Sequence, residues 1–264
     1  MKRILGILIL IVTIFIGCDT AEENIGYGNL VLNFEHKVDN DPASYDLMIY
    51  KNSAGNNYEI SEVQWIISDL ILIGKDNTEW PVGGEDWIHY IDSDLASTLR
   101  WEISELIKAG EYTDIRFTFG IKGEKNAPGM FTDPPESNMI WPYHMGGEEG
   151  GYHYMKLNGF WLKEESDRTP FNFHMGVGQI YDNENNITGF VQNWFETTLP
   201  LPGFIVKNEN ISELKIVMNI ENWFINPHIY DHEVYGGKIM NNQEAMGKIS
   251  ENGSDVFTIE FYDE

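Results

Sequence analysis

Residues 114–121 read DIRFTFGI, and this stretch indicates the fold class most directly. Every second residue in it is apolar: Ile115, Phe117, Phe119 and Ile121. The residues between them are polar or small, and this period of two is typical of a half-buried β-strand. Similar patterns predict strands over residues 30–38, 47–51, 60–73, 87–92, 153–162, 170–175, 194–199, 214–220 and 256–262, and the best helix signal is at 241–249. Many short strands with Gly- and Asn-rich turns predict an all-β fold, an antiparallel β-sandwich or related barrel with long aromatic loops and little helix.

The N-terminus has the three parts of a bacterial export signal. Two basic residues and an apolar run over residues 4–16 are followed by Gly17 and Cys18. A run of this length is too short to cross about 30 Å of hydrocarbon comfortably, so a signal peptide is favoured over a transmembrane helix. The four residues ending in Cys18 resemble a lipobox, in which the cysteine is acylated and becomes the mature N-terminus. We therefore expect a signal peptide over 1–17 and a lipidated acidic tether over 18–27; the alternative is an ordinary secretory signal peptide.

The remaining chain, residues 28–264, is expected to be one domain, because it is long enough for a large β core and contains no repeat or dividing linker. The protein carries 42 acidic and 17 basic side chains and a net charge of −25, which repels nucleic acid and anionic lipid headgroups. Cys18 is the only cysteine, so disulfides and thiolate metal sites are excluded from the domain. A transition metal would have to use imidazole, thioether, carboxylate or carbonyl ligands.

Two histidines lie in expected strands beside aromatic or apolar residues. Trp87 and His89 are two residues apart, so in a strand both side chains point to one face. His36 lies at the end of an otherwise apolar strand face. The alternative interpretation of these residues is structural, as core side chains whose polar atoms are satisfied by neighbours.

Three further histidines form a second set of candidates. His228 and His232 are four residues apart, and on a helical turn both would face one side, close enough for one ion. His174 alternates with phenylalanines, so it is expected on the opposite face of its strand. Most methionines are expected to fill the core, but Met145 follows a run of aromatic residues and is the candidate thioether ligand.

Residues 126–162 are unusually rich in aromatic residues, methionines and histidines. Loops this apolar must pack against the domain or present a binding surface. In the second case, a platform for stacking sugar rings would consist of Trp141, Tyr143, Tyr152 and Trp161. The alternative function is therefore a surface lipoprotein that binds glycans or other ligands.

Residues 182–186 have the oxygen spacing that begins an EF-hand loop, but Ile187 stands where that loop needs glycine. We therefore expect a polar turn there, and calcium is only a secondary candidate cofactor. The sequence contains no motif of a serine hydrolase, zinc protease, phosphate-binding loop or c-type haem site. The protein is therefore not expected to be an enzyme.

Six segments, in chain order, resemble the MbnP-like copper-binding proteins, relatives of the surface copper proteins MopE and CorA. The segments are residues 32–36, 65–70, 109–117, 139–143, 151–159 and 173–176. Characteristic stretches are AGEYTDIRF in the third, GYHYMKLNG in the fifth and FHMG in the last. The chain departs from the family pattern at residues 142–144, where a tryptophan is commoner, and by an insertion at 146–150.

This resemblance implies an exported β-sandwich that binds copper through histidines and a tryptophan oxidised to kynurenine, with a di-haem peroxidase-like partner performing the oxidation. The run Trp87-Ile88-His89 matches a Trp-x-His arrangement in the copper site of at least one relative. The expected ligands are His36 and His89, with Trp87 as the oxidised residue and a second tier of His174, His228 and His232. We expect a non-catalytic copper-binding lipoprotein of the outer membrane, on its periplasmic or cell-surface side.

Overall fold

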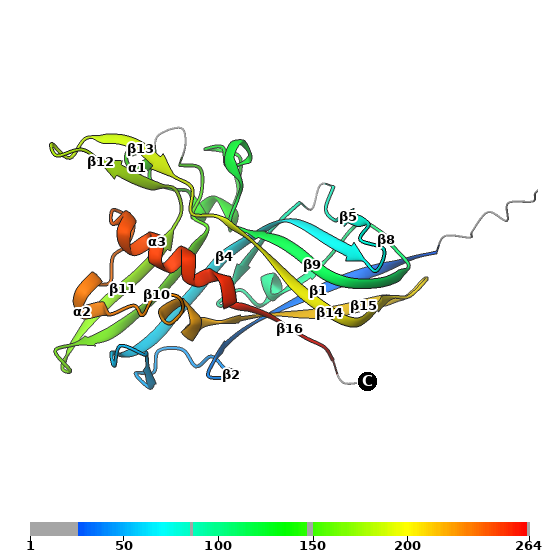
Figure 1. Ribbon diagram of the computed structural model, residues 1–264, viewed down its shortest axis with the longest axis horizontal. Coiled ribbons are helices and arrows are strands. Elements are labelled where there is room, and N and C mark those ends of the chain that lie inside the picture. The colour runs from blue at the N-terminus through cyan, green and yellow to red at the C-terminus, as the bar shows by residue number, and fades with distance from the viewer. Residues whose placement is uncertain (1–25, 85–86, 147–149, 263–264) are drawn as a thin grey trace, which may run out of the picture.

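The computed structural model describes residues 26–84, 87–146 and 150–262. Cys18, the predicted signal peptide and most of the predicted tether lie outside these residues. The described chain is an elongated β-sandwich with short helices at its periphery and a hairpin projecting at one end (Figure 1). None of the described helices is both long and apolar enough to cross a membrane.

The first sheet is built around β1 (Tyr27–Val38), which contains the strand predicted at residues 30–38. The strand order is β16-β15-β1-β2, and β7 and β8 also pair with β1. The other strands are β2 (Asp41–Pro42), β7 (Arg100–Glu102), β8 (Ile107–Lys108), β15 (Ile211–Asn219) and β16 (Phe257–Glu260). β1 and β15 run parallel, whereas the other described pairings in this sheet are antiparallel.

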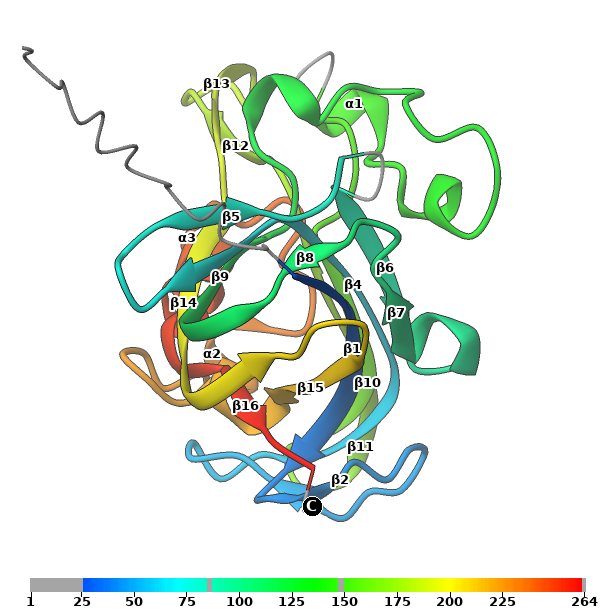
Figure 2. The ribbon, with the colours of Figure 1, turned by 90° about the vertical axis from the view of Figure 1, so that its right-hand side faces the viewer.

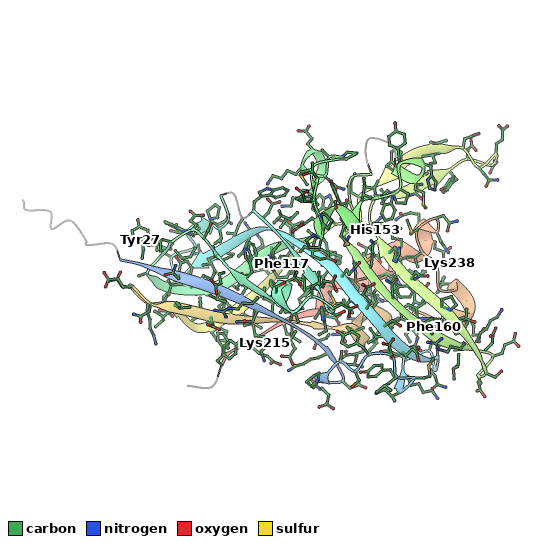
Figure 3. All side chains as sticks on the ribbon, turned by 180° about the vertical axis from the view of Figure 1, so that it is seen from behind. Tyr27, Phe117, His153, Phe160, Lys215 and Lys238 are labelled. Carbon is green, nitrogen blue, oxygen red and sulfur yellow. The ribbon has the colours of Figure 1, made fainter. Side chains whose placement is uncertain are left out.

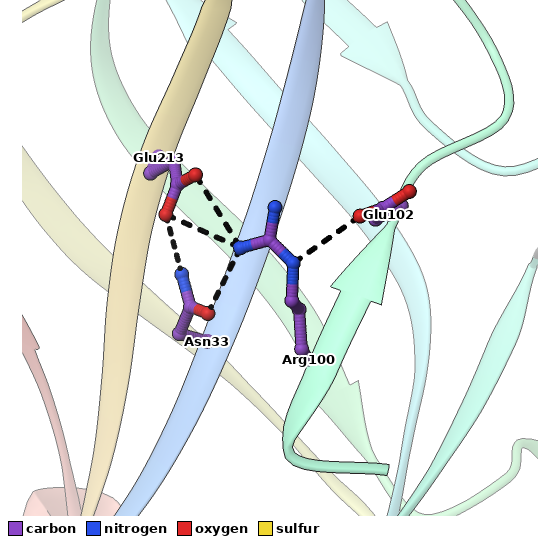
Figure 4. Close-up of polar contacts among 4 residues, drawn as sticks. All are labelled: Asn33, Arg100, Glu102 and Glu213. Carbon is purple, nitrogen blue, oxygen red and sulfur yellow. Dashed lines mark hydrogen bonds and ion pairs between the residues drawn. The ribbon is translucent and has the colours of Figure 1, made fainter. Parts of the chain in front are cut away.

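Polar side chains link three strands on the outer face of this sheet (Figure 4). The Arg100 guanidinium on β7 donates to Asn33 on β1 and to Glu213 on β15, each at 3.3 Å. It also donates to Glu102 at 3.2 Å, and Asn33 donates to Glu213 at 3.1 Å. Because these groups are partly exposed to water, each ion pair contributes roughly 0–1 kcal/mol, and burial of the opposite face dominates the stability of the sheet.

The second sheet has the order β11-β10-β4-β9-β14, and β3, β5 and β6 also pair with β4. Its strands are β3 (Tyr50–Lys51), β4 (Asn57–Gly74), β5 (Glu79–Pro81), β6 (Ile88–Asp92), β9 (Gly110–Phe119), β10 (Met155–Lys163), β11 (Asp167–Met175) and β14 (Phe195–Val206). All of its described pairings are antiparallel. The long strand β4 is therefore the axis of this sheet, with β10 and β11 on one side of it.

The projecting hairpin consists of β12 (Gly178–Tyr181) and β13 (Ile187–Val191). The polar turn predicted at residues 182–186 closes it. A carboxylate oxygen of Asp182 accepts from the backbone N–H of Glu184 at 2.8 Å and of Asn186 at 2.9 Å. An oxygen that the sequence offered as a calcium ligand thus accepts hydrogen bonds from the backbone N–H groups of the turn.

The α-helices among the described residues are short: α1 (Tyr143–Gly146), α2 (His232–Tyr235) and α3 (Gln243–Asn252). The described 3₁₀ turns are η1 (Ala96–Leu99), η2 (Gly123–Lys125), η3 (Glu136–Met139), η5 (Ile220–Phe224) and η6 (Gly253–Asp255). The predicted helix at 241–249 corresponds to α3, which begins after Asn242. The Asn242 side chain accepts from the backbone N–H of Ala245 at 3.1 Å, as an N-cap residue does.

Large apolar side chains from both sheets fill a common interior, which the end-on view in Figure 2 shows the strands surrounding. Ile115, Phe117 and Phe119 are completely buried, as their alternation predicted. Trp65 on β4 packs against Phe119 and Phe257, with ring centroids 6.2 and 5.1 Å apart. Burial of one such side chain contributes roughly 1.5–3 kcal/mol. The β-sandwich prediction is confirmed, and the parallel β1–β15 pair is an addition that alternation alone does not indicate.

Candidate metal centre

His153 and His174 face one another at the outer strands of the second sheet. His153 lies two residues before β10, and His174 lies in β11, the antiparallel partner of β10. Their ring centroids are 5.2 Å apart and the rings are nearly perpendicular, at 88°. Figure 3 labels His153 at the beginning of β10. Strand pairing therefore brings two imidazoles together that are separated in the sequence by the whole β10–β11 hairpin.

Each of the two histidines is positioned by its local backbone. The N–H of His153 donates to the carbonyl of Met139 at 2.6 Å, and Ile140 and Tyr152 form a β-bridge beside it. This bridge fixes the end of the loop from which His153 projects. In β11, burial alternates so that Phe171, Phe173 and Met175 face the core and His174 faces away from it, as the sequence predicted.

The hydrogen bond at Nδ1 determines which nitrogen of His153 can bind a metal. Nδ1 lies 2.9 Å from the Met139 carbonyl oxygen, and because a carbonyl can only accept, Nδ1 carries the proton. Nε2 then holds the lone pair. This nitrogen is buried and has no hydrogen-bond partner among the described residues. Burial of an unpartnered polar atom is costly, so the position of Nε2 requires an explanation.

His174 has the opposite tautomer. Its Nε2 lies 2.9 Å from the side-chain oxygen of Asn158, which also accepts from the Asn172 amide at 2.9 Å. The Asn158 amide nitrogen donates to Glu62 at 3.0 Å, and this contact fixes which end of the amide is the oxygen. Nε2 of His174 therefore donates, and Nδ1 holds the lone pair.

Both imidazoles are neutral at physiological pH. Burial lowers the pKa of His153 to about 3, and the positive charges of His174 and Lys156 act in the same direction. Burial also lowers the pKa of His174 to about 4, again assisted by Lys156. Protons therefore compete little with a metal for either lone pair near pH 7.

Trp141 completes this cluster of aromatic rings. Its ring centroid lies 4.7 Å from that of His153, at an angle of 60°, and its Nε1 has no hydrogen-bond partner within the described chain. The indole packs directly against the backbone of Gly176, where a Cβ atom would come within 2.4 Å of the ring. Glycine at this position, two residues after His174, lets the tryptophan approach the histidine pair.

His36, a ligand expected from the sequence, is a buried core residue with both ring nitrogens engaged. Its Nε2 accepts from the indole N–H of Trp65 at 3.0 Å, and its Nδ1 lies 3.2 Å from the Tyr45 hydroxyl. Because indole nitrogen only donates, the Nε2 lone pair is already used. Burial lowers the pKa of His36 to about 4. His36 therefore has the environment of a core histidine whose two ring nitrogens are both hydrogen-bonded, which was the alternative interpretation of this residue.

His89 and Trp87, the other residues expected at the metal, lie at the start of β6. The His89 ring is stacked between Trp101 and Phe34, at centroid distances of 4.9 and 5.4 Å, and its Nε2 lies 2.8 Å from the Thr98 carbonyl. Trp87 precedes the strand, with the Lys125 ammonium 5.2 Å from its ring centroid. A metal ligand role for this pair remains a prediction from the Trp-x-His match.

The structure separates His228 from His232. His228 lies in a loop and contacts the Glu251 carboxylate, whereas His232 begins α2 and is completely buried. The helical turn on which both would face one side does not form, because α2 begins only at His232. Five rings surround His232, and burial lowers its pKa to about 4. The five rings are those of Trp161, Phe171, Phe173, Phe224 and Tyr230.

The predicted aromatic platform for sugars is not present in this structure. Trp141, Tyr152 and Trp161 are 3%, 0% and 2% exposed, and only Tyr143, at 72%, is accessible. The described part of the apolar segment 126–162 therefore packs against the domain, which was the other of its two expected arrangements. Trp161 lies on the buried face of β10, and Tyr152 forms the β-bridge to Ile140.

A group of three carboxylates is the described cluster best suited to a hard cation. Glu62, Asp92 and Asp94 bring oxygen atoms within 4.8 Å of one another. The Gln64 amide donates to Glu62 at 2.9 Å and to Asp92 at 3.1 Å, and the Tyr90 hydroxyl donates to Asp92 at 2.7 Å. Because Glu62 and Asp92 already accept hydrogen bonds from neighbouring side chains, their positions do not require a bound cation. Calcium therefore stays a prediction from the sequence.

The sequence indicated His174 and Met145 as candidate metal ligands and Trp141 only as part of a sugar platform, and His153 was not among the predicted ligands. The signal for His153 and Trp141 was present in the segment GYHYMKLNG and in the aromatic run before it, both of which belong to the family resemblance. The contact between them depends on the bridge between residues 140 and 152, which no periodicity indicates.

Comparison with known proteins agrees with this fold. A family model described as MbnP matches residues 27–243. The solved structure of MbnP from Methylosinus trichosporium is similar, with a TM-score of 0.54 and 11% sequence identity, over 88% of this chain and 98% of that one. At this identity the likeness concerns the fold alone. No curated protein matches the chain.

Proposed function

This chain belongs to the MbnP family, and we propose that it binds copper outside the cytoplasm through His153 and His174, without catalysing a reaction of its own. The observation that carries the proposal is the buried lone pair on Nε2 of His153, which has no partner in the described structure. A second neutral imidazole, that of His174, lies 5.2 Å away between ring centroids. A metal ion shared by the two rings would explain the otherwise costly burial of Nε2.

The chemistry of both residues suits copper. Imidazole nitrogen is a ligand that copper prefers, and the remainder of the domain offers no thiolate. In each ring the second nitrogen donates to an oxygen, that of Met139 or Asn158. Such contacts fix the tautomer and the orientation of a metal-binding histidine. Copper held there would supply a soft, redox-active ion, and the protein would bind it and shield it from water.

We assign Trp141, in place of Trp87, as the candidate for the oxidised tryptophan that the family resemblance implies. The support is its ring contact with His153 and the absence of a described partner for its Nε1. The oxidant would come from a separate di-haem peroxidase-like protein. Mass spectrometry of the peptide containing each tryptophan distinguishes the two assignments, since only one would carry the mass change of kynurenine.

We further propose that lipid on Cys18 anchors the domain to the outer membrane. The support is the export signal and the lipobox-like residues before the only cysteine in the sequence. Labelling of cells with radioactive palmitate tests this proposal. Label is expected on the full chain and should be lost from Cys18→Ser; equal label on both proteins would overturn the assignment.

The copper proposal is tested by metal titration of the full chain in competition with a chromophoric chelator. His153→Ala and His174→Ala are each expected to reduce copper affinity by roughly 100-fold or more, since metal affinity depends strongly on each ligand. His228→Ala is the matched control, because it removes an imidazole whose described polar contact is with surface Glu251 and keeps the backbone hydrogen bonds to Asn252. Unchanged affinity in both site variants would overturn the assignment, and a loss in His89→Ala alone would move the site to β6.

A further inference from the structure

We propose that the thioether sulfurs of Met240 and Met145 complete the metal centre beside His174 and make it selective for the cuprous ion. This inference rests on the proposed function and names two residues and a metal oxidation state that the histidine pair alone does not specify. Both methionines are half-buried, so each packs against the core while part of its side chain stays accessible.

The two methionines and His174 line one pocket of about 370 Å³. The pocket lies between α1, β11 and the loop that leads into α3, so Met145 and Met240 approach His174 from different parts of the chain. Both methionines also pack against the hydrophobic core, which limits how far their side chains can move. Both methionine side chains therefore border the same pocket as His174.

Backbone register places Met240 next to His174. Asn172 on β11 and Lys238 in the loop form a parallel β-bridge, and the N–H of Asn172 donates to the Gly237 carbonyl at 2.6 Å. Two residues further along each segment stand His174 and Met240. Met240 lies in a turn closed by the N–H of Asn242, which donates to the Ile239 carbonyl at 3.0 Å, and its side chain lines the same pocket as His174.

Gly237 permits this close approach of the loop to β11. A Cβ atom at this position would lie 2.5 Å from the carbonyl oxygen of Pro170, closer than such atoms ever come. The loop is thus held against the strand at a defined point, three residues before Met240. This arrangement positions the backbone that carries Met240 beside β11.

The donor set suits soft, monovalent copper. Thioether and imidazole ligands favour Cu(I), whereas hard divalent cations prefer carboxylate oxygen. None of the six described residues that line the pocket is acidic, although the whole protein has a net charge of −25. The lining residues are Met145, Asn172, His174, Lys238, Met240 and Asn241.

A lysine in the pocket adds an electrostatic preference for a singly charged ion. Lys238 lines the pocket. A fixed positive charge repels a divalent ion about twice as strongly as a monovalent one at the same distance. Zinc and cupric ions are therefore disfavoured relative to Cu(I).

The test uses the full chain and two measurements. Cu(I) affinity is measured anaerobically, with ascorbate and a chromophoric Cu(I) chelator, and X-ray absorption reports whether sulfur lies at bonding distance from the bound copper. Met145→Leu/Met240→Leu is expected to weaken Cu(I) binding at least about tenfold and to remove the sulfur signal. Zinc affinity should not change. Met130→Leu is the control, because Met130 is also half-buried but does not line the pocket.

The outcomes separate this inference from the proposed function. If wild type binds Cu(I) without a sulfur signal and the double variant keeps its affinity, the thioether inference is overturned while copper binding through the histidines stands. If wild type binds no copper in either oxidation state, the proposed function fails and the inference with it. Leucine closely matches methionine in volume, and thermal melts of each variant identify any loss that is due to misfolding.

Discussion

His36 and His153 are both almost completely buried histidines with lowered pKa values, yet their ring nitrogens differ in one respect. Around His36, Trp65 and Tyr45 engage both nitrogens. Around His153, only Nδ1 has a partner in the described structure, and the ring of His174 lies 5.2 Å away between centroids. Burial and aromatic neighbours therefore do not identify a metal ligand in this protein, and neither does an unpartnered nitrogen alone, since both ring nitrogens of buried His232 also lack a described partner. What distinguishes His153 is an unpartnered lone pair beside a second imidazole.

The first prediction tests the difference between the two histidines by removing each ring in turn. His36→Leu leaves the buried Trp65 indole N–H without an acceptor and is expected to destabilise the fold by up to about 3 kcal/mol. His153→Leu removes an imidazole whose Nε2 is already unpartnered, so its effect on stability should stay within about 1 kcal/mol. Copper affinity should fall strongly in His153→Leu and stay close to that of wild type in His36→Leu. Urea denaturation and metal titration of both variants check this; loss of copper in His36→Leu without loss in His153→Leu would invert the assignment.

The second prediction concerns acid, to which both residues should respond alike. Each folded-state pKa, about 4 for His36 and about 3 for His153, lies below the value of about 6.5 in the unfolded chain. The unfolded state therefore takes up the proton first, so the stability contributed by each neutral ring is present above pH 6.5 and is lost as pH falls toward the folded value. Each ring accounts for about 2 kcal/mol between pH 6.5 and 5 in the metal-free protein.

Urea denaturation of the metal-free wild type and variants at pH 7 and pH 5 measures the contribution of each ring to the free energy of unfolding. Both His36→Leu and His153→Leu should lose less stability on acidification than wild type does, and by similar amounts. A difference confined to one variant would show that burial is not the common cause of the lowered pKa values. Addition of copper should change the pH dependence of wild type but not that of His153→Leu.

The third prediction concerns the hydrogen-bond partners of the histidine rings and their effect on copper affinity. Asn158→Ala removes the oxygen that orients His174 and is expected to reduce copper affinity about tenfold, or about 1.4 kcal/mol. Tyr45→Phe removes the corresponding partner of His36 and should leave copper affinity unchanged. Titration of both variants beside wild type measures the difference. Equal losses in the two variants would contradict the separation of the two histidine environments.

Alternation in the sequence predicted most of the fold, because a strand with one buried face must repeat every two residues. Ile115, Phe117 and Phe119 follow that rule and are fully buried. The parallel pairing of β1 with β15 and the β12–β13 hairpin could not be predicted in this way. Pairing direction and partner depend on which distant segment supplies the complementary edge, and the period of a single strand carries no information about that.

The metal centre was less predictable than the fold for a related reason. The outward orientation of His174 followed from its alternation with Phe171 and Phe173. His153, by contrast, is positioned by a hydrogen bond to Met139 inside an irregular loop. The difference between His153 and His36 lies in what their ring nitrogens meet, and residue type and spacing do not encode those contacts.

The length of β1 has a consequence for how this protein meets its surroundings. Twelve extended residues span about 40 Å, and the strand starts at Tyr27, the last residue of the predicted tether. Figure 3 shows Tyr27 at one tip of the molecule and His153 in the opposite half. With lipid at Cys18, the length of the sandwich would hold the histidine pocket away from the lipid headgroups. Ions and a second protein could then reach the pocket from the aqueous side without displacing the anchor.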